Sequence, residues 1–481
     1  MKNSERIWDN VETHKDDLIG MSDRVWGTPE LLYGEFESVA EHTAMLRQKG
    51  FAVEENVAGI PTAVTGIAGE GGPLIAFLGE YDALPGLSQV AGLAEPKELE
   101  NGGNGHGCGH NLLGGAALLA AVALKDWLEE TGTPGRVMYA GCPAEEGGGA
   151  KSFMAREGVF KDVDIALTWH PGNMTHVDDM LSLANTRIDF TFTGRPSHAA
   201  ASPHLGRSAL DAAQLMCVGV NYLREHMPDS DRIHYAYLDT GGTAPNVVHG
   251  TTTVRYVVRS RSLSGMRSLI ERVKKCAEGA AIMTETKVES KVLTAVSNML
   301  DNQPLARAMR QAMDTLGGVP FDDRDAEFAR QIRATLSPEE IAAAYTALGR
   351  NPEPDEVLCD YITDYVPGYT PMMGSTDVAD VSWQVPTIQA RVATHAVGTT
   401  LHTWQATAQG KSGIAHKGMV HAAKILAHTA VKTLTDPTLV SEAKAYHRAL
   451  LEKDPYVCPI PADTMPPLKP RPASKMAPAA A

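Results

Sequence analysis

One repeated pattern in the first 183 residues limits the fold most: an apolar run of strand length, a loop rich in glycine or acid, and a helix-like stretch. Strand-like runs lie within 73–86, 135–149 and 163–171, and the Ala/Leu-rich segment 111–130 is typical of a helix. Strands that alternate with helices predict an α/β domain with a mainly parallel sheet and helices on both faces. Because ligands of such sheets bind beyond the carboxyl ends of the strands, the residues after each run are candidates for chemistry.

The pattern changes at about residue 184, where the alternation of half-exposed strands begins. Segments 186–194 and 251–262 alternate as strands, whereas 206–227 and 265–283 are helix-like. This order predicts a β–α–β–β–α–β unit, a small α+β (ferredoxin-like) domain inserted into the larger one. The expected division is 1–183 and 299–460 for the larger domain, 184–298 for the inserted domain, about 321–365 for an acidic helical insertion, and 461–481 for a Pro/Ala-rich tail.

Composition excludes several classes of partner. The net charge of −15 argues against nucleic acids and anionic membrane surfaces. We find no run of about 18 apolar residues that would span a bilayer, and the N-terminal segment lacks the apolar stretch of a secretory signal. Six cysteines scattered through 481 residues do not form a disulfide framework. We therefore expect a cytoplasmic protein in a reducing environment.

The segment 104–115, NGHGCGHNLLGG, places His106, Cys108 and His110 on alternate positions. In an extended chain such positions face one side, and the intervening glycines allow close backbone approach. Thiolate and imidazole together suit zinc or a similar transition metal, and the helix that follows contributes its positive N-terminus. The alternative is a flexible turn that carries two histidines and a thiol.

Other strand ends add further candidate ligands. Glu145 and Glu146 follow an apolar run; since neighbours on an extended chain point opposite ways, one can ligate a metal while the other acts as a general base. His170 follows another run, His402 lies in a loop of small residues, and Asp82 can hydrogen-bond a ligating imidazole. Each has an alternative, an exposed acidic loop for the glutamates and a backbone-bonded histidine for His170. Together they predict a dinuclear metal site.

At this point several segments resemble those of the M20 metallopeptidase/amidohydrolase family, in particular its Cys-Gly-His branch, which cleaves N-acyl and N-aroyl amino acids. The resemblance covers about residues 20–460. It is carried by GEYDALPG, HGCGHNLLG, CPAEEGGG, WHPG, GRPSHAAASPHLGRSALDA, APNVV, GSTDVADVSW and VGTTLHTW.

The resemblance implies two divalent metal ions, Mn²⁺ or Zn²⁺, with cobalt also compatible with the donor set. Glu145 would be the general base for a metal-bound water, while His106 would support the loop. The chain departs from family patterns at Glu80, which stands where another branch has a ligating histidine, and at Asn111, where relatives commonly have aspartate. The implied metal ligands are Cys108, His110, Glu146, His170 and His402.

The inserted domain would correspond to the family's lid and dimerisation domain. There His198 would reach across a dimer to polarise the scissile carbonyl, and Asn246 and Arg259 would bind the carboxylate of the amino-acid product. For Arg259 the alternative is a surface arginine on a strand. His204, His234, His249, His416 and His421 are expected to be structural.

The implied activity is hydrolysis of the amide bond of N-acyl or N-aroyl amino acids, with p-aminobenzoyl-glutamate as the leading candidate. A dipeptidase and a deacylase of other acyl amino acids are alternatives. A different class of function is a metal-binding partner subunit that needs a homologous second chain. We expect a homodimer or an assembly with such a subunit, with no nucleic-acid or membrane partner.

Overall fold

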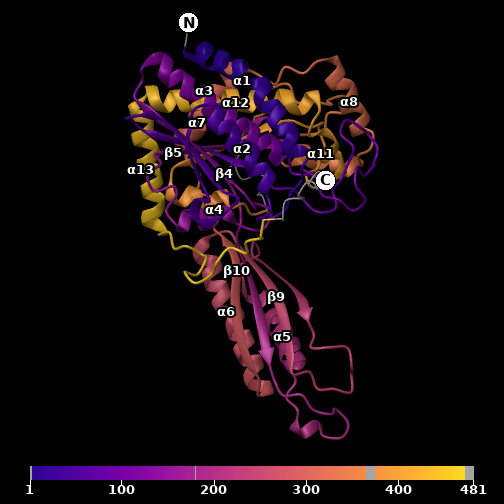
Figure 1. The fold of residues 1–481 in the computed structure, drawn as a ribbon. Helices are drawn as coiled ribbons and strands as arrows, with labels where there is room; N and C mark the ends of the chain where they lie inside the picture. Colours follow the sequence, from indigo (N-terminus) through magenta and orange to yellow (C-terminus); the bar gives the residue numbers. More distant parts are fainter. Residues whose placement is uncertain (1–2, 179, 365–373, 472–481) are drawn as a thin grey trace, which may run out of the picture.

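The computed structural model describes residues 3–178, 180–364 and 374–471. A seven-stranded sheet of order β1-β2-β4-β3-β5-β11-β6 forms the body of the molecule (Figure 1). The pairs β4–β3, β3–β5 and β5–β11 are parallel, while β1, β2 and β6 add antiparallel pairs at the edges. The predicted α/β class with a mainly parallel sheet is therefore confirmed.

The body uses residues from both ends of the chain. Its strands are β1 (Ala52–Glu55), β2 (Val64–Glu70), β3 (Leu74–Glu80), β4 (Gly135–Cys142), β5 (Ile165–Gly172), β6 (His176–Val177) and β11 (Thr387–Ala393). Its helices are α1 (Asn3–Trp26), α2 (Phe36–Gln48), α3 (His110–Thr131), α4 (Ala150–Arg156), α7 (Gln303–Leu316), α8 (Asp323–Arg333), α9 (Pro338–Thr346), α10 (Val378–Gln384), α11 (Trp404–Gln409), α12 (Gly413–Thr435) and α13 (Pro437–Lys453).

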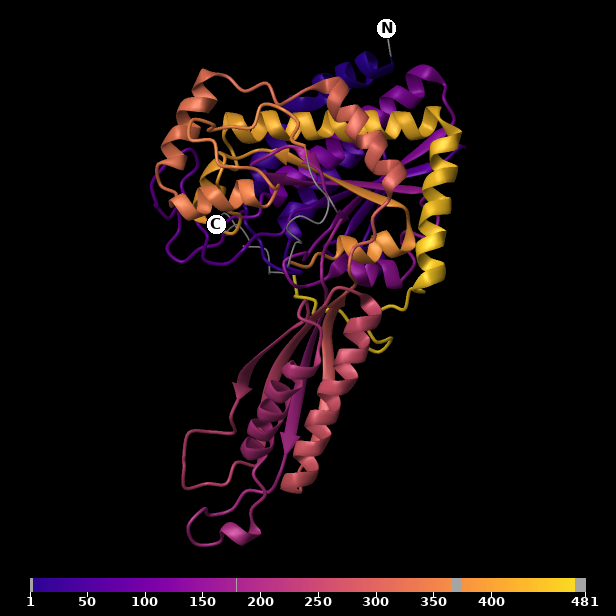
Figure 2. The same ribbon diagram turned by 180° about the vertical axis from the view of Figure 1, so that it is seen from behind.

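The central strands and α3 form the core because both are apolar on all sides. All seven residues of β3 are buried, and α3 and α12 pack side by side on the sheet, with α1 covering both helices. Within the described residues, α3 is the one helix whose length and composition would allow it to cross a membrane, and 94% of its apolar window is buried inside the protein. Helices α4 and α10 pack together on the opposite side of the sheet (Figures 1 and 2).

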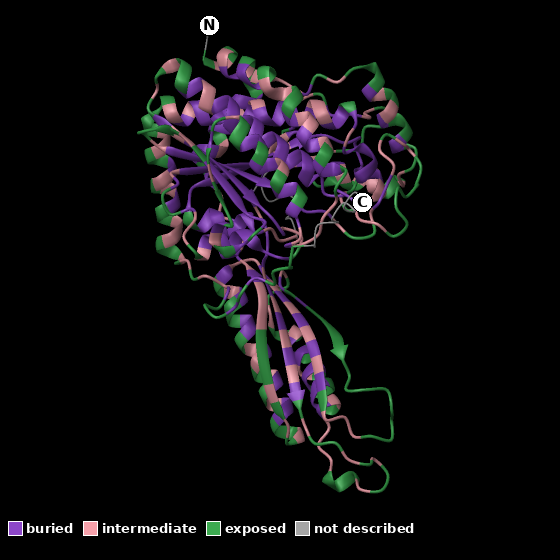
Figure 3. Ribbon diagram, viewed as in Figure 1, coloured by how far each residue is buried: buried purple, intermediate pink, exposed green. Residues whose placement is uncertain are grey.

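A second, antiparallel sheet of order β10-β7-β9-β8 projects from the body (Figure 2). Its elements follow the predicted β–α–β–β–α–β order: β7 (Ala184–Thr193), α5 (Ala209–Leu223), β8 (Arg232–Asp239), β9 (Thr251–Ser260), α6 (Leu263–Thr284) and β10 (Lys287–Val296). The even-numbered residues of β7 and β9 are buried against α5 and α6. The odd-numbered residues of both strands form the opposite surface, the helix-free face, which is half-buried or exposed (Figure 3).

The segment expected to be an acidic insertion packs on the loop between β11 and α11. Ala329 and Ile332 of α8 join a small apolar cluster with Ala396 and Ala408, and the N–H of Val397 donates to the carbonyl of Val357 at 2.9 Å. The insertion thus supports the loop that carries His402. Its expected last residue, 365, and residues 472–481 of the expected tail lie outside the described residues.

Candidate metal centre

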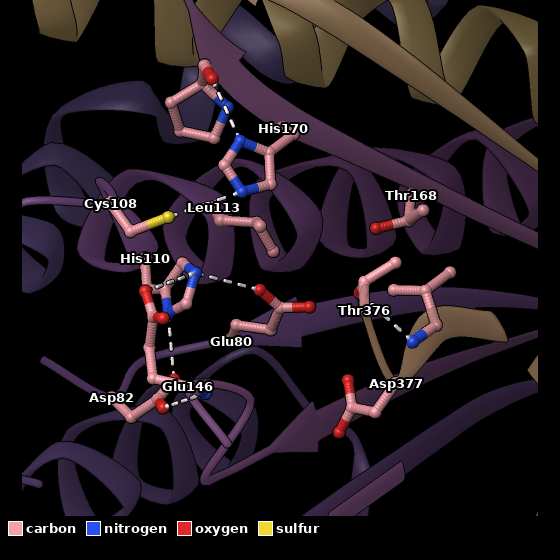
Figure 4. A network of polar contacts seen from close by, with 12 residues as sticks. Glu80, Asp82, Cys108, His110, Leu113, Glu146, Thr168, His170, Thr376 and Asp377 are labelled. Atoms are coloured by element: carbon pink, nitrogen blue, oxygen red, sulfur yellow. Dashed lines mark hydrogen bonds and ion pairs between the residues drawn. The ribbon is translucent and has the colours of Figure 1, made fainter. Parts of the chain in front are cut away.

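Four strand ends and one helix start bring the candidate ligands together. Figure 4 shows Glu80, Glu146 and His170 together with the residues at the start of α3. Glu80 ends β3, Glu145 and Glu146 follow β4, and His170 lies in β5. His402 follows β11 in the loop before α11. Three of these strands are parallel neighbours and β11 continues them, so their carboxyl ends lie at one edge of the sheet, as expected of an α/β domain.

The start of α3 brings the thiol to this edge. Gly109 precedes the helix with a φ of 77°, a left-handed conformation that side chains rarely adopt. A Cβ at this position would lie 3.0 Å from Pro171 Cγ, so the close approach to β5 also requires glycine. As a result Cys108 Sγ lies 3.6 Å from His170 Nε2 (Figure 4). The positive end of α3 stabilises a thiolate here.

Two groups of three candidate ligands share Cys108. The first adds His110 and His170, the second adds Glu146 and His402, and in each group the ligand atoms all lie within 4.8 Å of one another. A third group of the same compactness contains Glu80, His110 and Glu145. Cys108 would contribute to both groups, and this set of thiolate, imidazole and carboxylate donors suits a borderline transition metal.

The orientation of His110 is set by a carboxylate. His110 Nδ1 lies 2.8 Å from Asp82 Oδ1, whose other oxygen accepts the backbone N–H of Glu146 at 2.9 Å. With Nδ1 as the donor, the lone pair of Nε2 points toward Glu80 Oε2 at 3.2 Å and Glu146 Oε1 at 4.0 Å. Among the described residues, Glu80 Oε2 and His110 Nε2 are buried without a hydrogen-bond partner, and Glu146 Oε1 also faces His402 Nε2 at 3.1 Å. Three electron-rich atoms facing one another fit a bound cation.

The electrostatics of the cluster also favour positive charge. Burial lowers the pKa of His110, but Cys108, Asp82 and Glu80 outweigh burial and raise it well above its ordinary value. Hydrogen bonds with Cys108 and Glu146 raise the pKa of His402 to about 10. Burial raises the pKa of the Cys108 thiol, yet the neighbouring His110 and His170 bring it down to about 6. Without a cation in the cluster, these shifts favour the protonated forms of His110 and His402.

Metal affinity is therefore expected to weaken as the pH falls, because His110 and His402 must lose protons to become ligands. The pKa of His402 is raised to about 10, so at neutral pH an incoming metal ion displaces its proton. Each displaced proton raises the apparent Kd by up to about tenfold per unit fall in pH. Calorimetry with Mn²⁺ in two buffers of different ionisation enthalpy measures this release; a titration that releases no proton contradicts the assignment.

A buried lysine holds the carboxylate that faces His110. Lys151 Nζ lies 2.7 Å from Glu80 Oε1 and 2.7 Å from Asp377 Oδ1, and all three side chains are almost fully buried. The Lys151 backbone N–H also donates to Asp377 Oδ2 at 2.9 Å. Burial raises the pKa of Asp377 to about 6, although Lys151 opposes this. Lys151 thus fixes Glu80 with its second oxygen directed at His110.

Glu145 lies beside these carboxylates. Burial, Glu80, Asp377 and Glu146 together raise the pKa of Glu145 well above its ordinary value. A carboxylate whose pKa is raised holds a proton more strongly than an ordinary glutamate, which suits general acid–base catalysis, and a nearby cation would bring its pKa back down.

Arg259 lies close to this cluster. It pairs in register with Asn185 near the junction with the body and donates to Ser375 Oγ at 3.3 Å. A cavity of about 200 Å³ separates it from the glutamates. The residues lining this cavity include Glu145, Glu146, Gly147, Asn185, Arg187, Arg259, Ser375 and Asp377.

His198 and Asn246 lie elsewhere, together at the far tip of the projecting domain. The N–H of Ala199 donates to the Asn246 carbonyl at 2.9 Å, and His198 bridges to Val247. His198 is exposed and follows the ten-residue strand β7, which spans roughly 30 Å from the junction. Within one chain, neither residue reaches the metal-ligand cluster.

Other candidates have structural contacts. His106 lies 3.1 Å from the Val25 carbonyl, and Asn111 donates to Ser22 Oγ and the Gly410 carbonyl.

Sequence reasoning missed Lys151 and the role of Asp377. Asp377 lies in a segment that carries the family resemblance, which was the available signal; Lys151 follows the glutamate pair closely but reaches a partner 226 residues away.

The sequence as a whole is similar to known proteins. The sequence profile of Peptidase family M20/M25/M40 matches residues 76–430. The chain is 44% identical over 474 residues to one of the subunits of p-aminobenzoyl-glutamate hydrolase from Escherichia coli (strain K12), covering 96% of this chain and 98% of that protein. It is 27% identical to the Xaa-Arg dipeptidase of Mus musculus, over 93% of both chains.

The fold is shared with solved structures. One is a dinuclear metal-binding peptidase of the M20 family from Bacillus subtilis, which matches with a TM-score of 0.56 at 18% identity. The match covers 88% of this chain and 99% of that one. At this identity the similarity shows that the two chains share a fold.

Proposed function

Because the chain belongs to Peptidase family M20/M25/M40 and is a hydrolase that acts on amide bonds, we propose that it uses two divalent metal ions, Mn²⁺ or Zn²⁺, to hydrolyse N-acyl or N-aroyl amino acids. The proposed substrate is p-aminobenzoyl-glutamate, which gives p-aminobenzoate and glutamate. The observation that carries the proposal is the pair of ligand groups that share Cys108 beside Glu145. The near-full-length relative that is named for this reaction supports the choice of substrate.

The metal ions would be held by the two groups described above: Cys108 with His110 and His170, and Cys108 with Glu146 and His402. When bound, such ions supply Lewis acidity and lower the pKa of water. The buried Asp82 keeps His110 in the tautomer that presents Nε2 to the centre.

The protein's own groups move the proton and hold the substrate. Glu145 takes a proton from the attacking water and returns it to the amide nitrogen, so that the C–N bond breaks with a neutral amine as the leaving group. Arg259, next to the cavity, binds the carboxylate of the amino acid.

We further propose that the active unit is a dimer. His198 and Asn246 lie roughly 30 Å from the junction at the end of a ten-residue strand, so in one chain they cannot reach substrate bound near Arg259. The tip of a second copy would supply both residues. There His198 donates a hydrogen bond to the carbonyl oxygen as negative charge develops.

Mixing two inactive variants tests this arrangement. Glu145→Gln removes the base of its own site, whereas His198→Ala removes a residue of the partner's site. After unfolding and refolding together, about half of the dimers are hybrids with one complete site each, so about a quarter of the wild-type activity is expected. Separately refolded variants are the control, and a mixture no more active than its components contradicts the shared site.

A substrate panel tests the function itself. The purified chain, loaded with Mn²⁺ or Zn²⁺, is incubated with p-aminobenzoyl-glutamate, other N-aroyl and N-acyl amino acids, and dipeptides, and free amino acid is measured. Release from p-aminobenzoyl-glutamate in preference to the others is expected. Preferential release from dipeptides favours the dipeptidase alternative, and absence of release from every compound contradicts the proposal.

A partner-subunit role is the second candidate, favoured by one observation: the near-full-length relative is named as one subunit of a hydrolase that has a second named subunit. In that case the chain alone is inactive on the panel, and activity arises when a homologous second chain is added.

We also propose a cytoplasmic location, supported by six free cysteines, one of which is a candidate metal ligand that must stay reduced.

A further inference from the structure

Three arginines lie on the helix-free face of the projecting domain. Arg187 is on β7, and Arg255 and Arg259 are on the adjacent β9. The register pairs Asn185 with Arg259 and Asp189 with Arg255, which places Arg187 between the two β9 arginines along the strands. All three are partly buried rather than fully solvated, so each guanidinium needs an anion or a set of acceptors.

Arg255 has such an anion. Its Nε and Nη2 donate to the two oxygens of Asp189 at 2.7 and 2.9 Å, a two-bond arrangement that commits this carboxylate. Arg187, by contrast, makes no hydrogen bond or ion pair with any residue in the described part of the chain. Asp189, the carboxylate whose charge acts on Arg187, already accepts both hydrogen bonds from Arg255.

Arg187 extends toward the catalytic edge. A Cβ on Gly147, the residue after the glutamate pair, would lie 3.4 Å from an Nη atom of Arg187. Arg187 and Arg259 line the same cavity as Glu145. Burial and the positive charge of Arg187 lower the pKa of Arg259. Two cations that destabilise each other across one cavity favour a ligand with two negative charges.

We propose that Arg187 determines specificity by binding the side-chain carboxylate of a dicarboxylic amino acid, while Arg259 binds its α-carboxylate. This inference rests on the proposed function and deepens it, because it names an acidic residue as the leaving half of the substrate. A lysine or arginine in the same position would face both guanidinium groups and be repelled. A neutral residue would leave Arg187 without its partner.

The test compares two ligands that differ in one group. p-Aminobenzoyl-glutamate and p-aminobenzoyl-glutamine have nearly the same shape, but only the first has the second carboxylate. The wild-type chain should prefer the glutamate compound in kcat/KM by about 10- to 100-fold, the effect of a charge-assisted hydrogen bond. Arg187→Gln should reduce kcat/KM for the glutamate compound by a similar factor and change that for the glutamine compound by less than about threefold.

Arg255→Gln is the matched control, since it removes the same charge from the same face at a residue whose partner is Asp189. It should leave the preference unchanged. Retained activity of Arg187→Gln on the glutamine compound shows that this variant folds, and Arg187→Lys should keep part of the preference. Equal losses on both compounds, or an unchanged preference in Arg187→Gln, overturn the proposal.

Direct binding separates this inference from the proposed reaction. Calorimetry with the same two compounds measures the preference without turnover. A preference for the glutamate compound that is lost in Arg187→Gln supports the assignment of Arg187 even when no hydrolysis is found, in which case only the proposed reaction fails. Equal affinity of the wild-type chain for the two compounds overturns the assignment of Arg187 whether or not hydrolysis occurs.

Discussion

Glu145→Gln is expected to lower kcat by about 10²- to 10⁴-fold, the usual contribution of a general base. Glutamine has nearly the same size but cannot accept the proton of the attacking water. The substitution also removes one charge from a cluster in which Glu80, Asp377 and Glu146 raise the pKa of Glu145. The metal-free variant should therefore unfold at the same temperature as the wild type or at a higher one.

Metal analysis and thermal unfolding distinguish the loss of a general base from the loss of metal or of the fold. Glu145→Gln should retain the wild-type metal content and should bind substrate with little change in affinity. Glu146→Gln is the adjacent control, because Glu146 belongs to one of the two groups that share Cys108 and Glu145 belongs only to the third group. Glu146→Gln should lose metal as well as activity. A Glu145→Gln enzyme that keeps more than about a tenth of the wild-type kcat shows that another residue is the base.

Lys151→Met is expected to destabilise the fold by about 3–5 kcal/mol, the cost of breaking a buried ion pair. Methionine has similar length, so the loss comes from charge and not from volume. Lys151 contacts Glu80 and Asp377 at 2.7 Å each, with no solvent exposure of its own. Without it, two carboxylates remain buried beside each other, and Asp377 should take up a proton.

The same substitution at the surface is the control. Lys15 lies 2.7 Å from Glu12, but both side chains are 40% exposed, so Lys15→Met should change stability by less than about 1 kcal/mol. Urea unfolding of both variants measures the difference. If both substitutions lower the free energy of unfolding equally, burial does not strengthen the contribution of the Lys151 ion pairs to stability.

Much of the candidate site could be predicted from the sequence, because short sequence patterns determine which residues lie at the ends of the strands. Strand-length apolar runs that alternate with helices force a parallel sheet, and the carboxyl ends of its strands meet at one edge. Glu146 and His170 each follow or end such a run, so their proximity could be predicted without knowing the strand order.

The remaining features depend on contacts that no local pattern encodes. Lys151 and Asp377 are 226 residues apart, and only the packing of α4 on α10 brings them together. The alternation of β7 predicts that Arg187 faces outward, but its closeness to Gly147 depends on how the projecting domain meets the body. The position of His198 at a distant tip could not be predicted because it depends on strand length and direction.

The sharing of Cys108 between two ligand groups also affects the durability of the centre. A thiolate is the donor most easily oxidised, and conversion to a sulfenic or sulfinic acid changes its charge and geometry. With separate ligands, one such event would empty one metal position and leave the other. With a common sulfur atom, a single oxidation removes a ligand from both groups at once, so catalysis would fail in one step and would not decline gradually.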